Sequence, residues 1–211
     1  MSPGRALPVP PLLIITDRGQ ADRDLPDIAE AAFQAGARWL SLRERDLKAN
    51  ARDALLRALV ALGTRHGARI TLHGAPEAAL AAGAAGVHLP AGAVAAEARR
   101  CLGPAGLIGI SVHDEAELGA ASGADYVTVS PVFLSASKPG YGPALGLAGL
   151  TALARRAPCP VVALGGVTAE RAADCLRAGA AGVAVMGPVM RAPEPGREVA
   201  ALLSALGRAR G

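Results

Sequence analysis

Short β-branched or aliphatic runs alternate along the chain with longer stretches rich in Ala, Leu and Arg. Four times the transition has the same form, in FQAGARWLSL, LAAGAAGVHL, AASGADYVTV and LRAGAAGVAVM. In each copy a helical pattern ends in a small-residue Gly-Ala element, and a strand pattern follows at once. The glycines at 36, 83, 123 and 179 can adopt the left-handed conformation that ends a helix. Repeated returns of this kind predict serial βα units and a parallel sheet covered by helices.

Eight strands are predicted by short apolar runs. They are Leu12–Thr16, Trp39–Arg43, Arg69–His73, Gly86–Leu89, Leu107–Val112, Tyr126–Ser130, Val161–Leu164 and Gly182–Met186. A period of 3.6 predicts a helix after each strand. These helices are Leu25–Ala35, Ala51–His66, Pro76–Ala82, Ala93–Leu102, Glu115–Ser122, Leu147–Arg156, Ala169–Ala178 and Arg197–Ala209. Eight near-equal units favour one closed (β/α)₈ barrel over an open doubly wound sheet. We predict a single domain over residues 1–211, with a flexible N-terminus at 1–10.

The amino-acid composition argues against a membrane protein, a secreted protein and a nucleic-acid-binding protein. Hydrophobic residues make up 51% of the 211 residues but aromatic residues only 2%, so we expect an aliphatic core. No apolar run approaches the roughly 20 residues that a membrane span needs, and the N-terminus lacks a signal-peptide core, so we expect a cytoplasmic protein. The net charge of +4 suits anionic small molecules, whereas the lack of aromatics for base stacking argues against nucleic acid. The three cysteines have no metal-binding spacing and are expected to be buried small hydrophobes.

Strand alternation brings polar side chains to one barrel mouth. In IGISVH, the residues Ile108, Ile110 and Val112 face outward, whereas Gly109, Ser111 and His113 face inward. The same rule turns three further sets inward, namely Ser41 with Arg43, Thr71 with His73, and Thr128 with Ser130. Active sites of barrel enzymes lie at this face, which makes the convergence a candidate site.

His113 is the main catalytic candidate, because it ends a strand at this face. The alternative is that it caps the following helix, whose first turn contains Asp114 and Glu115. His88 also points inward, and its Gly-Val-His-Leu context favours a hydrogen-bonded core histidine.

Arg43 and Arg45 flank Glu44 at the end of the second strand. A guanidinium inside a barrel mouth needs an anion, because burying it unpaired is prohibitive. The alternatives are a clamp on a substrate phosphate or carboxylate and a structural pair with Asp17 or Glu44.

Glycines follow both of the last two strands, in ALGGVT and VMG. At Gly165, Gly166 and Gly187, next to Met186, no side chain obstructs an anion that approaches the backbone N–H groups. Phosphate sites of barrels lie after strands seven and eight, so we predict a phosphate site here. A connection of about 16 residues, PVFLSASKPGYGPALG, follows the sixth strand and is long enough to suggest a functional loop.

Together these motifs resemble the thiamin-phosphate synthase and TenI superfamily of (β/α)₈ proteins over nearly the whole chain. The resemblance rests on LLIITDR, LRER, AAGVHLP, IGISVH, GADYVTVSPVF with SASKPG, and PVVALGGVTAERAADCLRAGAAGVAVMG. It implies the barrel fold and the phosphate site at Gly165, Gly166 and Gly187.

Two activities occur in this superfamily. The synthases join a pyrimidine pyrophosphate to thiazole phosphate, and they hold Mg²⁺ with Gln-x-Arg-x-Lys, Asn-Asp and a further acidic residue. Here Ser41 and Arg45 replace the glutamine and lysine, His73-Gly74 replaces Asn-Asp, and LPAGAV carries no carboxylate. TenI-like proteins are thiazole tautomerases, which need one acid/base group and no metal, and their catalytic histidine matches His113.

The sequence therefore favours a thiazole tautomerase without cofactor, whose carboxythiazole phosphate is aromatised by His113. The resemblance places Arg43, Arg45, His73, Ser111, Ser130 and Lys138 around the substrate. A synthase with Mg²⁺ is the alternative, because Ser135, Ser137 and Lys138 resemble the synthase's Thr-x-Thr-Lys loop. A non-catalytic regulator is a third hypothesis. We expect a thiazole phosphate as the ligand, no nucleic-acid or membrane partner, and leave a homodimer open.

Overall fold

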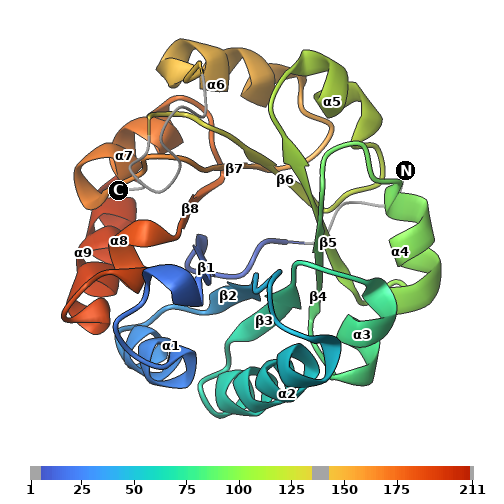
Figure 1. Cartoon of the computed structure of the whole chain (residues 1–211). Helices are drawn as coiled ribbons and strands as arrows, with labels where there is room; N and C mark the ends of the chain where they lie inside the picture. The colour runs from blue at the N-terminus through green and yellow to red at the C-terminus, as the bar shows by residue number, and fades with distance from the viewer. Residues whose placement is uncertain (1–5, 135–142, 210–211) are drawn as a thin grey trace.

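A computed structural model of the chain describes residues 6–134 and 143–209. It is a closed barrel of eight parallel strands in chain order, with helices around the outside (Figure 1). The strands are β1 (Leu12–Ile15), β2 (Trp39–Leu42), β3 (Arg69–Leu72), β4 (Gly86–Leu89), β5 (Leu107–Val112), β6 (Tyr126–Val129), β7 (Val161–Ala163) and β8 (Gly182–Val185). The (β/α)₈ barrel predicted from the sequence is confirmed.

Each predicted helix is present, with ends shifted by no more than a few residues. The helices are α1 (Leu25–Gln34), α2 (Ala49–Arg65), α3 (Pro76–Ala81), α4 (Ala95–Leu102), α5 (Glu115–Ala120), α6 (Gly146–Arg156), α7 (Ala169–Arg177), α8 (Gly187–Met190) and α9 (Pro195–Arg208). A 3₁₀ helix, η1 (Arg18–Gln20), follows β1. The sequence analysis missed η1 and α8, because elements this short contain no readable period.

Glycine ends the helices at the four repeated returns, as predicted. Gly36, Gly83, Gly123 and Gly179 have φ angles of +105°, +69°, +83° and +100°. Only glycine adopts this region without strain, which is why the chain can leave each helix and re-enter the sheet within a few residues.

Two apolar layers hold the barrel together. The outward strand residues, including Ile108, Ile110 and Val112, pack in one cluster with the helices. A smaller cluster fills the barrel interior with Leu13, Ile15, Trp39, Leu107, Tyr126, Val162 and Ala184. The expected aliphatic core therefore describes the outer layer, whereas two of the few aromatic side chains lie inside the barrel.

Gly109 makes room for one of these rings. A Cβ atom at this position would lie 2.1 Å from Cζ of Tyr126. The tyrosine ring thus occupies the space that an inward side chain on β5 would take, and its hydroxyl reaches the polar layer above it.

The predicted flexible N-terminus falls partly outside the described residues, since 1–5 are not among them. Leu7 packs against the interior cluster, close to the start of β1. None of the helices in the described ranges combines the length and the apolar character that crossing a membrane requires.

Candidate active site

A cavity of about 490 Å³ opens at the carboxyl ends of the strands. Ten of the eleven side chains or glycines predicted to form the site line it. They are Arg43, Arg45, His73, Ser111, His113, Ser130, Gly165, Gly166, Met186 and Gly187. Lys138, like Ser135 and Ser137, lies outside the described residues. The strand alternation therefore located one common cavity, while the role of each residue remains a prediction.

The loop after β7 is shaped by two glycines with positive φ, +95° at Gly165 and +60° at Gly166. A Cβ atom at Gly165 would lie 2.8 Å from Cα of Pro131, and one at Gly166 would lie 2.5 Å from the carbonyl oxygen of Leu134. The N–H of Phe133 also donates to the carbonyl of Gly165 at 3.0 Å. The loops after β6 and β7 are thus packed too closely for any residue larger than glycine.

Backbone N–H groups are available for an anion on this side of the cavity. Within the described residues, no loop or turn hydrogen bond is donated by Gly166 or Gly187. Gly187 is also the first residue of α8, directly after β8. This arrangement suits a phosphate, which accepts several N–H hydrogen bonds at once.

Two arginines beside this loop were missed by the sequence analysis. Arg171 of α7 lines the cavity, donates to the carbonyl of Gly166 at 3.0 Å, and lies over the ring of Phe133 at 4.8 Å. Arg191 follows α8, lines the same cavity and donates to Gln20. Arg171 lies on a helix and Arg191 directly after one, both beyond the strand ends, so strand alternation could not reveal where they point.

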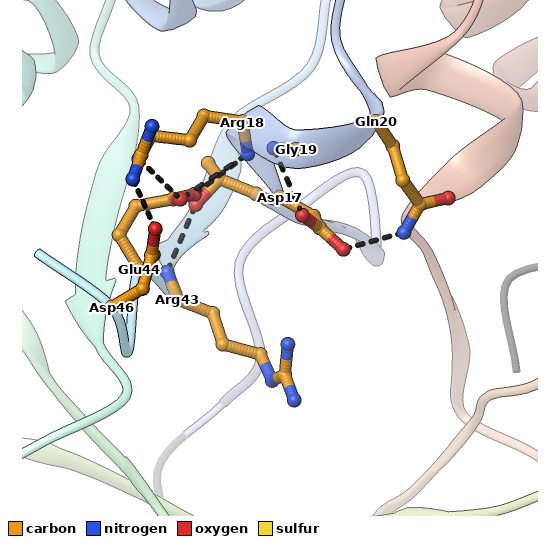
Figure 2. Close-up of polar contacts among 8 residues, drawn as sticks. Asp17, Arg18, Gly19, Gln20, Arg43, Glu44 and Asp46 are labelled. Atoms are coloured by element: carbon orange, nitrogen blue, oxygen red, sulfur yellow. Dashed lines mark hydrogen bonds and ion pairs between the residues drawn. The ribbon is translucent and has the colours of Figure 1, made fainter.

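Arg43 is not paired with the neighbouring carboxylates. Within the described residues, the ion pairs of Glu44 involve Arg18 rather than Arg43. Figure 2 shows the guanidinium of Arg43 extending away from Glu44, while its backbone N–H donates to Oγ1 of Thr16 at 2.9 Å. Burial, together with the positive charge of Arg45, lowers the pKa of Arg43. Within the described residues no ion pair joins Arg43 to Glu44 or Asp17, although the charges of both carboxylates act on its guanidinium and partly offset the lowering of its pKa.

Glu44 has its own partners on the loop after β1. It is 3% exposed, and burial raises its pKa. The backbone N–H of Arg18 donates to both carboxylate oxygens at 3.2 Å. Asp17 in turn accepts hydrogen bonds from the N–H of Gly19 and the side chain of Gln20 (Figure 2). These carboxylates hold η1 against the loop after β2 and do not line the cavity.

His113 lies at the end of β5 with one ring nitrogen fixed. Its Nδ1 atom is 2.7 Å from Oε2 of Glu117, and its backbone N–H donates to the same oxygen at 2.7 Å. The cap of α5 is Asp114, whose carboxylate accepts the N–H of Glu117 at 2.9 Å. The helix-cap alternative for His113 is therefore wrong. Glu117 was missed, although its i+4 spacing in HDEAE was a visible signal.

His88 is a hydrogen-bonded core histidine, as expected. Its Nδ1 lies 3.1 Å from the hydroxyl of Tyr126, and its Nε2 lies 3.0 Å from Oγ of Ser111 and 3.2 Å from Oγ1 of Thr128. The ring centroid of His73 is 4.5 Å from that of His88. Burial lowers the pKa of His88 to about 3 and the pKa of His73 well below its usual value. Both rings are therefore neutral at physiological pH, so His113 stays the candidate for proton transfer among the histidines that line the cavity.

The donor set of the cavity does not fit Mg²⁺. Its described lining residues include Arg43, Arg45, Arg171 and Arg191 but neither Asp nor Glu. The described residues also contain no group of three or more His, Cys, Asp and Glu placed to hold a metal ion. Mg²⁺ in proteins is held by oxygen ligands, typically one or two carboxylates with substrate phosphates. Four guanidinium groups favour an anionic ligand instead.

Comparisons with known proteins identify the family. Residues 12–189 match the TMP-TENI family model, described as thiamine monophosphate synthase. The thiamine-phosphate synthase of Roseiflexus castenholzii is 42% identical over 186 residues, which cover 86% of this chain and 82% of that protein. The thiamine-phosphate synthase of Methanoculleus marisnigri is 42% identical over 189 residues, covering 85% of this chain and 87% of the relative.

A solved structure agrees with these relatives. Thiamine phosphate pyrophosphorylase from Pyrococcus furiosus superposes with a TM-score of 0.84 at 27% identity, covering 95% of this chain and 96% of that one. The names of the relatives support thiamin biosynthesis and the synthase alternative, and none of these names supports the tautomerase that the sequence analysis favoured. The fold, the matched family model and the two relatives agree that this chain belongs to the thiamine-phosphate synthase family.

Proposed function

We propose that this family member is a thiazole tautomerase, which aromatises a carboxythiazole phosphate by proton transfer through His113. The observation that carries the proposal is the set of residues that line the cavity. A histidine at the end of β5 shares it with the glycine-lined anion loops, and no carboxylate belongs to its described lining. This combination suits proton transfer on a phosphorylated ring better than it suits the departure of a metal-bound pyrophosphate.

In this proposal the phosphate of the ligand accepts N–H hydrogen bonds from Gly166 and Gly187. Arg43, which makes no ion pair within the described residues and lines the cavity, attracts the carboxylate. The lone pair on Nε2 of His113 takes a proton from one carbon of the thiazole unit and the imidazolium returns it to another. Substrate and product contain the same atoms, so the step needs no oxidant, reductant or leaving group. A histidine suits both directions, because it gains and loses a proton near neutral pH.

A thiamine-phosphate synthase is the second candidate. The specific observation in its favour is the name shared by the relatives at 42% identity, and the comparisons support it better than the tautomerase. Against it stand His73 and Gly74 where the resemblance implies Asn-Asp, and the missing carboxylates around the cavity.

Two assays on the same preparations separate these candidates. We expect wild-type protein to aromatise the carboxythiazole phosphate tautomer without added metal, and His113→Asn to be slower by about 10²–10⁴-fold, the usual contribution of a general acid–base group. His66→Asn, a change directly after α2 at a residue that does not line the cavity, serves as the matched control.

The second assay follows thiamin phosphate formation from the pyrimidine pyrophosphate and thiazole phosphate in the presence of Mg²⁺. Turnover in this assay with none in the first would replace the tautomerase by the synthase. A chain that is inactive in both assays but binds thiazole phosphate would support the regulator hypothesis instead.

A further inference from the structure

The carboxylate of Glu117 is placed to control which nitrogen of His113 carries the proton. A single oxygen, Oε2, lies 2.7 Å from both the backbone nitrogen and Nδ1 of His113. An ionised carboxylate only accepts hydrogen bonds, so Nδ1 must be the protonated nitrogen of the neutral ring. The lone pair of that tautomer is on Nε2, at the opposite edge of the imidazole.

Glu117 is itself held in place from both ends. Its backbone N–H donates to Oδ1 of Asp114 at 2.9 Å, which closes the first turn of α5. Its carboxylate then reaches back to the strand end, so that the helix start and the end of β5 are joined through one side chain. The side chain is 32% exposed and that of His113 is 33% exposed, so the pair is partly shielded from water.

Among the described residues, Glu117 is the carboxylate that contacts the ring of His113 directly. Glu115 on the same helix is paired with Arg156 of α6. On the strand side, His88 is neutral and bonded to Ser111. Asp114 is engaged with the N–H of Glu117, and Arg43 and Arg45 line the same cavity from β2. An anion in direct contact therefore balances the cationic field that would otherwise oppose a proton on His113.

We propose that Glu117 is a positioning residue for His113, which fixes the Nδ1–H tautomer and stabilises the imidazolium formed when Nε2 takes a proton. This inference rests on the proposed function, because it assigns Glu117 a role through His113. The same logic governs the carboxylate in a Ser-His-Asp triad, where the acid orients the histidine and does not itself become protonated.

A spectroscopic test of this inference needs no substrate. Long-range ¹H–¹⁵N spectra of the whole protein report which nitrogen of His113 carries the proton. We expect the Nδ1–H tautomer in wild type and in Glu117→Gln, because the glutamine carbonyl still accepts that hydrogen bond. We expect Glu117→Ala to move the ring toward the Nε2–H form. The matched control is Glu115→Gln on the same helix, which should leave the spectrum unchanged.

The pH dependence of tautomerisation isolates the charge of Glu117. Loss of a neighbouring anion disfavours the imidazolium, so the acidic limb of the rate profile should shift to lower pH in Glu117→Gln, by about one pH unit. At its new optimum this variant should be slower by roughly tenfold, and Glu117→Ala slower still. If Glu117 had only a structural role, its replacement would change the temperature of thermal unfolding but not the acidic limb of the pH–rate profile.

The outcomes separate the two proposals. If His113→Asn keeps full activity, the proposed function fails whatever Glu117 does. If His113→Asn is inactive while Glu117→Gln keeps the wild-type pH profile, and Glu117→Ala keeps the wild-type tautomer, the positioning role is overturned alone. Should Glu117→Ala not fold, the rate profile of the isosteric glutamine variant decides the question.

Discussion

At the scale of single residues, the loop proposed to bind the anion depends on backbone shape rather than on side-chain chemistry. Gly165 and Gly166 combine positive φ with contacts that leave no room for a Cβ atom. The dipeptide GG alone would occur in many turns. Its close contact with Pro131 and Phe133 is what makes this copy specific, and that contact joins two loops distant in sequence.

The first prediction concerns Gly166→Ala, which should weaken phosphate binding and lower the free energy of unfolding. A left-handed conformation costs an L-residue roughly 1–2 kcal/mol. The added Cβ would also lie 2.5 Å from the carbonyl oxygen of Leu134 and 2.7 Å from Cβ of Phe133, so the loop must move. Calorimetric titration with inorganic phosphate and urea unfolding measure the two effects.

Gly67→Ala is the matched control for this substitution. Gly67 has a φ of +64°, close to the +60° of Gly166, and a Cβ there would meet nothing within 4 Å. It should share the conformational cost and keep phosphate binding. Equal phosphate affinity in both variants would contradict the proposed anion loop.

The sequence predicted the site residues on strands but not those on helices. Ser111, His113 and Arg43 were found because alternation fixes the side toward which a strand residue points. Arg171 and Arg191 line the cavity from α7 and from the end of α8, and Glu117 contacts His113 from α5. Their direction depends on how each βα loop sets the first turn of its helix. The periodicity of a single sequence does not specify that direction.

At the scale of elements, the agreement between the predicted and the observed strands has a cause in the local sequence. Each repeated return is specified by a glycine and a strand within about ten residues, so the start of each of these strands was predicted to the residue, and Gly86–Leu89 and Leu107–Val112 match over their whole length. The other strands end one residue earlier than predicted, where the chain turns into the catalytic-face loops. Thr16 and Ser130 are the first residues after β1 and β6. Both still follow the inward–outward alternation of side chains, although they lie beyond the last residues that pair with the neighbouring strand.

A charged residue joins elements at the opposite, amino-terminal end of the barrel. Asp125, directly before β6, accepts the N–H of Ile108 at 2.8 Å and a guanidinium N–H of Arg99 at 2.7 Å. Arg99 also donates to the carbonyl of Gly106 at 2.5 Å. Asp125 thereby connects α4 with the starts of β5 and β6.

The second prediction concerns this connection. Asp125→Ala should lower the free energy of unfolding by about 1–3 kcal/mol, because it leaves a buried N–H and a partly buried guanidinium without their acceptor. The control is Asp174→Ala, which removes an exposed ion pair with Arg177 and should cost about 0–1 kcal/mol. Urea unfolding measures both, and phosphate binding should be unchanged in both. Equal stabilities would show that Asp125 contributes no more than a surface carboxylate.

At the scale of the whole molecule, the barrel interior is divided into two zones. Trp39, Leu107 and Val162 belong to the apolar filling. His73, His88 and Ser111 line the cavity above it. Composition could predict that the core is large and mostly aliphatic, but not that the rings of Trp39 and Tyr126 are inside the barrel. Nor could it predict that two histidine rings contact each other at the floor of the cavity, with centroids 4.5 Å apart.

These histidines make the stability of the whole barrel depend on pH. Burial lowers the pKa of His88 to about 3, against about 6.5 for an exposed histidine, and lowers that of His73 in the same direction. Between pH 6.5 and the folded-state values, the unfolded chain therefore binds more protons than the folded protein. The free energy of unfolding should fall as pH falls below 6.5, by up to about 1.4 kcal/mol per pH unit for each histidine.

The last prediction is that His88→Gln will weaken this pH dependence, although it destabilises the protein at neutral pH. Glutamine can still reach Tyr126 or Ser111 but binds no proton near pH 6, so the slope below pH 6.5 should decrease by about one histidine's share. Urea unfolding at pH 7.5, 6.5 and 5.5 measures that slope. Glu44, whose pKa is raised by burial, contributes with the opposite sign, so the slopes of variant and wild type must be compared directly. His66→Gln, directly after α2, is the control for the loss of a histidine outside the barrel interior, where the ring contacts Glu30 at 2.8 Å. A wild-type slope in His88→Gln would show that the buried ring is not the origin of the effect.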